Sequence, residues 1–303
     1  MQRESGDGLS YPAQLQEVLS AAGVERPVLL GVGEDAWAFA HSDSEAIRIF
    51  PELSVEFVEE LADMYGCLGE HQFSFECPCV YEVRTCNDIP YTIEKKLPGR
   101  PMPDVCRTLR GSPRRQVLQG YMAAIAELGA LKIDGPFGGL IPSSVWSTSD
   151  TWERFLQHEL EVSAEQMLSR FLEAVPDFGD LVSRIESSIR DTLRWDSTSL
   201  VHGDAYPGNI MVDDAGRIVS VLDFGRHSLL GDPRLDVAIA IELTDVIDEF
   251  TQDDTEYLRE LVDEEMSGPW RALSAILLAN QLRGDERIVR KCAASLEEAG
   301  DKF

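Results

Sequence analysis

The chain has 303 residues, long enough for two packed units with a sizeable core. Its 54 acidic and 27 basic residues give a net charge of −27, which nucleic acid and anionic membranes repel, so we expect neither as a partner. No apolar run approaches the roughly 18 residues that a membrane span needs. The polar first residues carry no secretion signal, and a cytoplasmic location is expected. The charge favours either a cationic substrate or a surface adapted for solubility.

The six cysteines do not indicate a metal site. Four of them fall between residues 67 and 86, but none forms a C-x-x-C pair and no histidine stands at zinc-ligand spacing beyond them. Reduced thiols in a cytosolic protein are therefore the better interpretation.

The first third of the sequence predicts a small α+β unit. Ser54 is a suitable N-cap for a helix whose apolar stripe is Val58, Leu61, Tyr65 and Leu68. A turn is expected at 31–35, and short apolar runs predict strands at 28–30, 37–39, 46–50, 80–83 and 91–93.

The segment 97–103 is rich in Pro and Gly and predicts a linker, beyond which helices dominate. Ser112 and Pro113 predict a helix start, followed by Val117, Tyr121, Ala124 and Leu128 at helical spacing. Further helices are expected at 151–171 and 181–193, and strands at 200–201, 210–212 and 218–222, the last two joined by a turn at 213–216.

The segment from His202 to Asn209, followed by Asp223-Phe224-Gly225, carries the chemistry. Phosphoryl transfer needs oxygen ligands for a magnesium ion that bridges the phosphates, and a carboxylate that accepts the proton of the attacking hydroxyl. Asn209 and Asp223 supply hard oxygen ligands, and Asp204 supplies the base. Alone, Asp223 is more often a turn carboxylate and His202 a packed histidine, but the ordered combination is much rarer.

In these residues the chain resembles the aminoglycoside phosphotransferase family. That family also has H-G-D in the catalytic loop, an Asn at the position of Asn209 and an aromatic residue after the metal-binding Asp. A G-D-P-x-x-D-x-A segment follows, here residues 231–238, and residues 94–101 resemble the family's hinge. The resemblance implies a bilobal protein-kinase-like α+β fold, with an antiparallel-sheet N-lobe at 1–95 and a larger, mainly helical C-lobe at 96–303. Nucleotide is expected between the lobes.

The resemblance also implies the role of each matching residue. Asp204 is the catalytic base, Asn209 and Asp223 hold Mg²⁺, and ATP or GTP is the phosphate donor. Asp236 braces the catalytic loop, and His202 hydrogen-bonds the loop backbone. In the hinge, the backbone around Glu94 and Lys96 holds the adenine edge.

Two features of the N-lobe depart from the family pattern. Gly31 and Gly33 match the turn that covers the phosphates, but Ala36 replaces the third glycine, so a plain β-turn remains an alternative. The lysine of the third strand is replaced by Arg48, which keeps the charge and can grip phosphate through its planar fork, although the two residues are not interchangeable.

The helix partner of Arg48 is expected to be a glutamate. Glu60 is preferred over Glu56 and Glu59, and at least two of the three are expected to belong to a solvated helix face.

The acceptor is less well defined by the sequence. Residues 242–265 hold eleven carboxylates: Glu242, Asp245, Asp248, Glu249, Asp253, Asp254, Glu256, Glu260, Asp263, Glu264 and Glu265. They suit an amine-bearing acceptor, but in so acidic a chain a solvated face is the more frequent explanation. Trp152 and Trp270 could stack on a sugar, although core packing is more common for such residues.

Three functions follow from this reading of the sequence. The first is phosphorylation of an aminoglycoside or a similar amine-bearing compound, hence antibiotic resistance. The second is a metabolic kinase for a sugar, choline or an amino alcohol. The third is a catalytically silent nucleotide-binding scaffold, against which the intact Asp204, Asn209 and Asp223 argue.

Overall fold

The computed structural model describes residues 11–300, except 34, 192, 263–265 and 267. The chain forms two compact units. Unit 1 covers the residues up to Gln72 and Glu76–Pro98, and unit 2 covers Phe73–Phe75 and the residues from Gly99 onward. Within the described ranges, no helix is both long enough and apolar enough to cross a membrane.

Unit 1 is an antiparallel sheet with one helix on each face. Its strands pair in the order β1-β2-β3-β5-β4. Its elements are α1 (Ala13–Ala21), β1 (Val28–Val32), β2 (Trp37–Ala40), β3 (Glu45–Ile49), α2 (Val55–Gly69), β4 (Val80–Cys86) and β5 (Ile89–Lys95).

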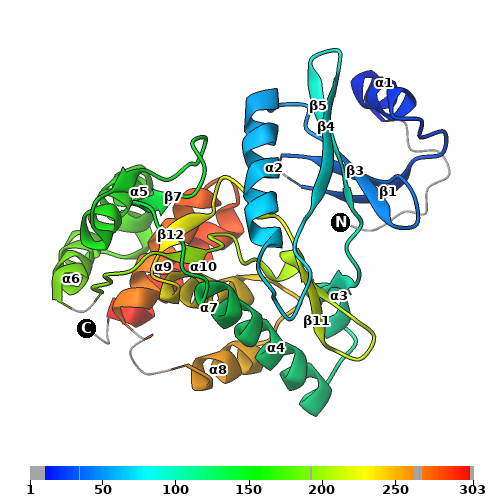
Figure 1. Ribbon diagram of the computed structural model, residues 1–303. Helices are drawn as coiled ribbons and strands as arrows, with labels where there is room; N and C mark the ends of the chain where they lie inside the picture. The colour runs from blue at the N-terminus through cyan, green and yellow to red at the C-terminus, as the bar shows by residue number, and fades with distance from the viewer. Residues whose placement is uncertain (1–10, 34, 192, 263–265, 267, 301–303) are drawn as a thin grey trace. The chain divides into compact units, whose positions relative to one another are not determined.

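The pleat of β3 explains the two helix layers. Ile47 and Ile49 point to the face that packs with Leu15 and Val18 of α1, whereas Arg48 points to the opposite face and reaches α2. Figure 1 shows α1 and α2 on either side of this sheet.

The helix and the strands predicted for this unit are confirmed, with one change. The Ser54 side chain accepts a hydrogen bond from the Phe57 amide at 3.3 Å, and the predicted stripe of α2 is buried. However, β1 continues through Gly31 and Val32, which were predicted as turn, because both residues pair with β2. Glu34, also assigned to that turn, lies outside the described residues.

Unit 2 is mainly helical, with two small sheets. Its helices are α3 (Met102–Cys106), α4 (Gly111–Gly129), α5 (Trp152–Ala174), α6 (Phe178–Asp191), the 3₁₀ turn η1 (Pro207–Asn209), α7 (Arg234–Val246), α8 (Gln252–Glu260), α9 (Pro269–Gln281) and α10 (Glu286–Gly300). Its strands are β6 (Arg100–Pro101), β7 (Phe137–Gly139), β8 (Thr148–Ser149), β9 (Ser199–Val201), β10 (Ile210–Val212), β11 (Ile218–Val221) and β12 (Leu229–Gly231).

Two boundaries in unit 2 differ from the prediction. The linker segment contains β6, which pairs with β10, and the start of α3, because a proline needs no amide partner in the first turn of a helix. Likewise, α4 begins at Gly111 with Arg110 as its N-cap, so Ser112 lies inside the helix. The hairpin of β10 and β11 and the helix capped by Thr151 are confirmed.

The core of unit 2 contains both tryptophans considered as sugar platforms. Trp152 and Trp270 are buried, in agreement with the core-packing alternative. Gly231 of β12 passes directly over the Trp152 indole, where an added Cβ would lie 2.3 Å from Cζ3. Position 231 therefore requires glycine for steric reasons.

We expect Gly231→Ala to lower the free energy of unfolding by about 1–3 kcal/mol, because the methyl group overpacks against the indole. Gly179→Ala in α6 is the matched control, since a Cβ there meets no atom of the described residues within 4 Å. The control should be as stable as the parent or slightly more so. Chemical denaturation of both variants tests the difference, and equal stabilities would contradict the steric explanation.

Candidate active site

The segment between β9 and β10 brings Asp204 and Asn209 together. The Asn209 Nδ2 donates to the Asp204 carbonyl O at 3.1 Å and to its carboxylate Oδ2 at 3.2 Å. Both residues are half-buried. Since the amide nitrogen faces Asp204, the Asn209 Oδ1 remains as an oxygen donor for a cation.

A backbone hydrogen bond places Asp223 next to Asp204 and Asn209. The Leu222 amide donates to the Asn209 carbonyl O at 2.8 Å, so the residue after Leu222 is adjacent to the catalytic loop. Asp223 has a φ of 62°, a conformation that few residues other than glycine adopt, and its side chain is exposed. One amide oxygen and one carboxylate suit Mg²⁺, which is usually held by one or two protein oxygens together with phosphates and waters.

A buried carboxylate fixes the backbone of the catalytic loop. Asp236 accepts the amide N–H of His202 at 2.6 Å and that of Gly203 at 2.9 Å, as predicted from its position in the motif. Gly203 has a φ of 74°, and an added Cβ would lie 1.8 Å from the His227 carbonyl O. The H-G-D motif therefore needs glycine at this position because a neighbouring backbone occupies the space of a side chain.

His202 joins the catalytic loop to the strand before Asp223. Its Nε2 lies 2.9 Å from the Leu222 carbonyl O, and its Nδ1 accepts the Asp204 amide at 3.3 Å, so the ring bonds backbone groups as predicted. Burial lowers the pKa of His202 to about 4, so the ring is neutral at pH 7. Burial likewise raises the pKa of Asp236 to about 7, against the effect of the two amide bonds.

One support of this loop was not recognised from the sequence. Tyr121 of α4 was predicted only as one of four residues at helical spacing, yet its hydroxyl donates to the Ala205 carbonyl O inside the catalytic loop. An apolar stripe does not reveal such a bond, because a tyrosine in the stripe looks like any other core aromatic.

In unit 1, Arg48 contacts several side chains on the α2 face of the sheet. Its Nε lies 3.8 Å from the Glu94 carboxylate, its Nη1 donates to the Tyr65 hydroxyl at 3.1 Å, and its guanidinium lies 5.2 Å from the Phe50 ring centroid. Glu94 is buried and also accepts the Thr92 hydroxyl at 3.2 Å. The Glu94 side chain thus belongs to a charged network inside unit 1, which the hinge resemblance did not foresee.

The three candidate helix glutamates differ in exposure. Glu56 and Glu59 are exposed on α2, whereas Glu60 is partly buried. This is the pattern expected when two of the three belong to a solvated face.

The remaining residues assigned to the nucleotide lie at the ends of strands in unit 1. Gly31 is in β1, and the Gly33 amide donates to the Ala36 carbonyl O at 2.9 Å in the hairpin that follows. The Lys96 amide donates to the Ser44 carbonyl O at 2.9 Å. An adenine contact by the Lys96 backbone would therefore have to use its carbonyl oxygen.

The acidic stretch 242–265 is neither uniformly an acceptor surface nor uniformly solvated. Glu242 is buried and pairs with Arg271 at 3.1 Å, and Asp254 is buried and pairs with Arg114 at 2.6 Å. Burial alone would raise the pKa of Asp254, but bonds from Arg114 and Thr251 outweigh it and lower that pKa. Two of the acids thus belong to buried ion pairs, while Asp263, Glu264 and Glu265 lie outside the described residues.

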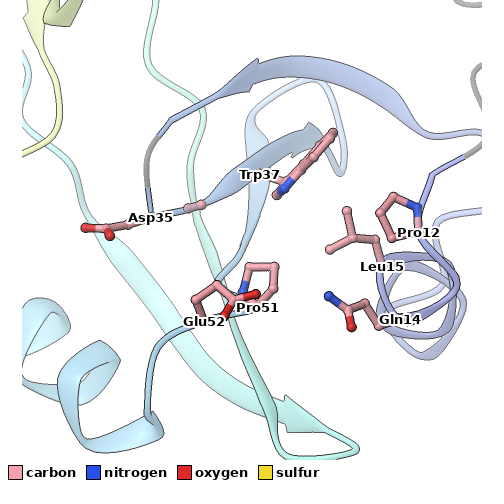
Figure 2. A pocket seen from close by; sticks show the side chains of 8 residues that line it. Pro12, Gln14, Leu15, Asp35, Trp37, Pro51 and Glu52 are labelled. Atoms are coloured by element: carbon pink, nitrogen blue, oxygen red, sulfur yellow. The ribbon is translucent and has the colours of Figure 1, made fainter. Parts of the chain in front are cut away.

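A hollow of about 240 Å³ lies elsewhere in unit 1 and includes none of the predicted site residues. Figure 2 shows Trp37, Leu15 and Pro12 along one side of it and Pro51 and Glu52 along another. The remaining lining residues are Gln14, Asp35 and Ala36. The hollow therefore does not coincide with the set formed by Asp204, Asn209 and Asp223.

The neutral, buried state of His202 has a consequence for acid stability. Because its pKa is about 4 in the folded chain and about 6.5 when unfolded, only the unfolded state gains a proton between these pH values. The stability advantage of the parent over His202→Gln should be full above pH 6.5. It should then fall by up to about 1.4 kcal/mol per pH unit as the pH drops toward 4. Denaturant unfolding across this range, without nucleotide or divalent cation, tests this. A difference that does not change with pH would show that the pKa of His202 is the same in the folded and unfolded states.

Solved structures with the same architecture are known. The gentamicin complex of APH(2")-IIa aligns with a TM-score of 0.61 and 17% identity over 95% of this chain and 96% of that one. The aminoglycoside phosphotransferase APH(3'')-Id from Streptomyces rimosus ATCC10970 aligns with a TM-score of 0.59 and 17% identity, over 88% and 97% of the chains. The macrolide 2'-phosphotransferase MphH from Brachybacterium faecium aligns with 0.57 and 18%, over 93% and 97%.

These similarities confirm the kinase-like α+β fold expected from the sequence. No curated protein sequence matches the chain. A family model described as "Phosphotransferase enzyme family" (APH) matches residues 25–273, which is most of the chain. In agreement with the H-G-D, Asn209 and Asp223 constellation, the protein belongs to this phosphotransferase family.

Proposed function

We propose that this phosphotransferase moves the γ-phosphate of ATP or GTP to a hydroxyl of a small amine-bearing molecule such as an aminoglycoside. One observation carries the proposal. The side chains of Asp204 and Asn209 are hydrogen-bonded to each other, and the backbone next to Asp223 is bonded to Asn209. An acid, an amide and a second acid thus gather in unit 2 of a chain that belongs to a phosphotransferase family.

In this proposal Asp204 orients the acceptor hydroxyl and takes its proton. Asn209 and Asp223 would hold Mg²⁺ through Oδ1 and the carboxylate, and the bound ion would neutralise charge on the transferring phosphoryl group. Asp236 and His202 hold the loop backbone, so the base keeps its position without itself being buried in a packed core.

We assign nucleotide contacts to residues of unit 1. Gly31 and Gly33 would lie along the phosphates, and Arg48 would contact them in place of the usual lysine. Glu60 and Glu94 would orient Arg48, a role that the 3.8 Å approach of Arg48 to Glu94 supports for the latter. The backbone at Glu94 and Lys96 would meet the base.

Several facts favour an amine-bearing acceptor. Related structures include a streptomycin and ATP complex of one aminoglycoside phosphotransferase and a GDP and kanamycin complex of another. The net charge of −27 attracts cationic compounds. A cytoplasmic enzyme that confers antibiotic resistance would follow from such an acceptor. A metabolic kinase acting on sugars or choline remains the alternative, and a panel of acceptors assayed with both nucleotides separates the two.

The assignment of the base predicts the effect of Asp204→Asn. Losing the base should reduce kcat by about 10²- to 10⁴-fold, with little change in the melting temperature. Asp214→Asn is the matched control, because the Asp214 side chain is fully exposed on the β10–β11 turn. The assay is coupled ADP or GDP release with the best acceptor of the panel. Full activity of Asp204→Asn would refute the assigned role.

The assignment of Gly31 predicts a separate effect on the nucleotide. A Cβ built on Gly31 meets no atom of the described residues within 4 Å, so Gly31→Ala should leave stability unchanged. If phosphate approaches this backbone, the methyl group should raise the nucleotide KM roughly five- to tenfold. Gly66→Ala in α2, where space is equally open, is the control. An unchanged nucleotide KM would favour a plain β-hairpin that makes no phosphate contact at Gly31.

A further inference from the structure

The turn that follows Asp223 is tied to the catalytic loop by a buried serine. The Ser228 hydroxyl donates to the His202 carbonyl O at 3.0 Å and accepts the Gly225 amide at 3.1 Å. The Ser228 amide donates to the Gly225 carbonyl O at 3.0 Å, which closes the turn. Because Ser228 is fully buried, solvent does not compete for its hydroxyl. The backbone just after Asp223 is therefore fixed relative to the H-G-D motif.

A second set of bonds to the same turn comes from a distant part of unit 2. We call residues 140–147, which connect β7 to β8, the strap. The strap donates to the consecutive carbonyl oxygens of residues 226–228. These bonds run from the Leu140 amide to Ser228 at 3.0 Å, from the Ser144 hydroxyl and the Val145 amide to Arg226 at 2.8 and 3.1 Å, and from Trp146 Nε1 to His227 at 2.6 Å. The turn is thus held both from within and by a loop far away in the sequence.

The bond from Trp146 also reaches the residue before the proposed base. The His227 carbonyl O accepts Trp146 Nε1 and lies against Gly203, where an added Cβ would be only 1.8 Å from it. The Trp146 indole is buried and packs edge-on against the Phe155 ring of α5, with the ring centroids 6.1 Å apart. Since packing fixes the indole, its N–H fixes the His227 carbonyl against the catalytic loop.

A buried carboxylate anchors the far end of the strap. Glu159 of α5 accepts the Ser147 amide at 3.1 Å and the Ser147 hydroxyl at 2.6 Å, and only 7% of its surface is exposed. An added Cβ on Gly139 would lie 2.4 Å from the Ser144 Cβ, so the strap packs directly on the β7 backbone. A buried carboxylate is costly unless it is hydrogen-bonded, so Glu159 stabilises one conformation of the strap. The strap is thus a fixed support for the turn.

Asp223 lies between two fixed backbone points. On one side, the Leu222 amide is bonded to Asn209, and the Leu222 carbonyl O lies within hydrogen-bond distance of His202. On the other side is the turn from Gly225 onward, which the strap holds. The φ of 62° at Asp223 costs conformational energy and persists only where the surroundings impose it. The strap therefore helps to impose the backbone conformation that presents the Asp223 carboxylate.

We propose that the strap positions Asp223 as a Mg²⁺ ligand and that Trp146 is its main positioning residue, acting through the His227 carbonyl. This inference rests on the proposed function, which takes Asp223 as a ligand of the ion. Groups that orient a metal ligand without touching the metal change its affinity about 10- to 100-fold when they are removed. The Trp146 N–H should therefore act on metal affinity, whereas the packing of its ring should act on stability.

The test compares Trp146→Phe with Trp152→Phe in the full chain. Both indoles pack against Phe155, but Trp152 Nε1 has no hydrogen-bond partner among the described residues, so only Trp146→Phe removes a bond to the turn. Electron paramagnetic resonance follows the binding of Mn²⁺, which like Mg²⁺ prefers oxygen ligands, in the presence of ADP or GDP. We expect Trp146→Phe to raise the Mn²⁺ Kd about tenfold and Trp152→Phe to leave it unchanged. The nucleotide Kd without a divalent cation should change in neither variant.

Ser144→Ala removes a second bond of the strap with a smaller change in volume. It should raise the Mn²⁺ Kd about three- to tenfold. The matched control is Ser183→Ala, because the Ser183 hydroxyl donates to a carbonyl of its own helix α6. In turnover assays of the strap variants, the KM for Mg²⁺ should rise, the acceptor KM should not, and excess Mg²⁺ should restore kcat. Since coupling is reciprocal, adding Mg²⁺ to the nucleotide-bound parent should slow amide hydrogen exchange of the strap, as measured by mass spectrometry.

An unchanged Mn²⁺ Kd in both Trp146→Phe and Ser144→Ala would overturn the inference, as would an equal rise in Trp152→Phe. If melting curves show that neither strap variant folds, hydrogen exchange of the parent decides, and a strap that does not respond to Mg²⁺ is the contrary result. Asp223→Asn separates this inference from the proposed function. If Asp223→Asn weakens Mn²⁺ binding and the strap variants do not, only the role of the strap is wrong. If Asp223→Asn binds Mn²⁺ as tightly as the parent, the metal ligand assigned in the proposed function is wrong.

Discussion

The candidate site depends on the hydrogen bonds that the buried Asp236 carboxylate accepts from the catalytic loop. The carboxylate accepts two consecutive amides of the loop, those of His202 and Gly203. A carboxylate buried in this way would be costly without those bonds, and the amides would be equally costly without the carboxylate. These bonds hold the loop in one conformation. The conformation of the loop in turn sets the positions of Asp204 and Asn209.

The acidity of the chain has two distinct physical effects. On the surface, excess carboxylates repel one another and attract cations over distances of about a Debye length. In the interior of unit 2, by contrast, Glu242 and Asp254 are each neutralised by one arginine. Arg114 also donates to two backbone carbonyls, those of Cys106 and Glu249, so one buried ion pair organises the region next to the catalytic loop.

Much of the architecture could be predicted because local rules agreed with the final fold. Ser54 capped its helix and the stripe of α2 was buried, since both features depend on neighbours within a few residues. The predicted boundaries of strands and helices were wrong where pairing with a distant strand decided them. Gly31 joined β1 because β2 lies beside it, and Pro101 joined a strand because β10 does. Propensity cannot anticipate a partner strand that is distant in sequence.

The sequence by itself determined the phosphotransferase motif, most strands of unit 1 with the helix between them, and the candidate residues for the chemistry, since these depend on residue type and spacing. Only the tertiary structure decided which acids are neutralised in the core, which hydroxyl braces the catalytic loop and which side chains surround Arg48. Those outcomes depend on contacts such as Tyr121 with Ala205 and Arg114 with Asp254, whose partners lie far apart in the chain. Burial and pairing are properties of the packed fold, and no local pattern of residues encodes them.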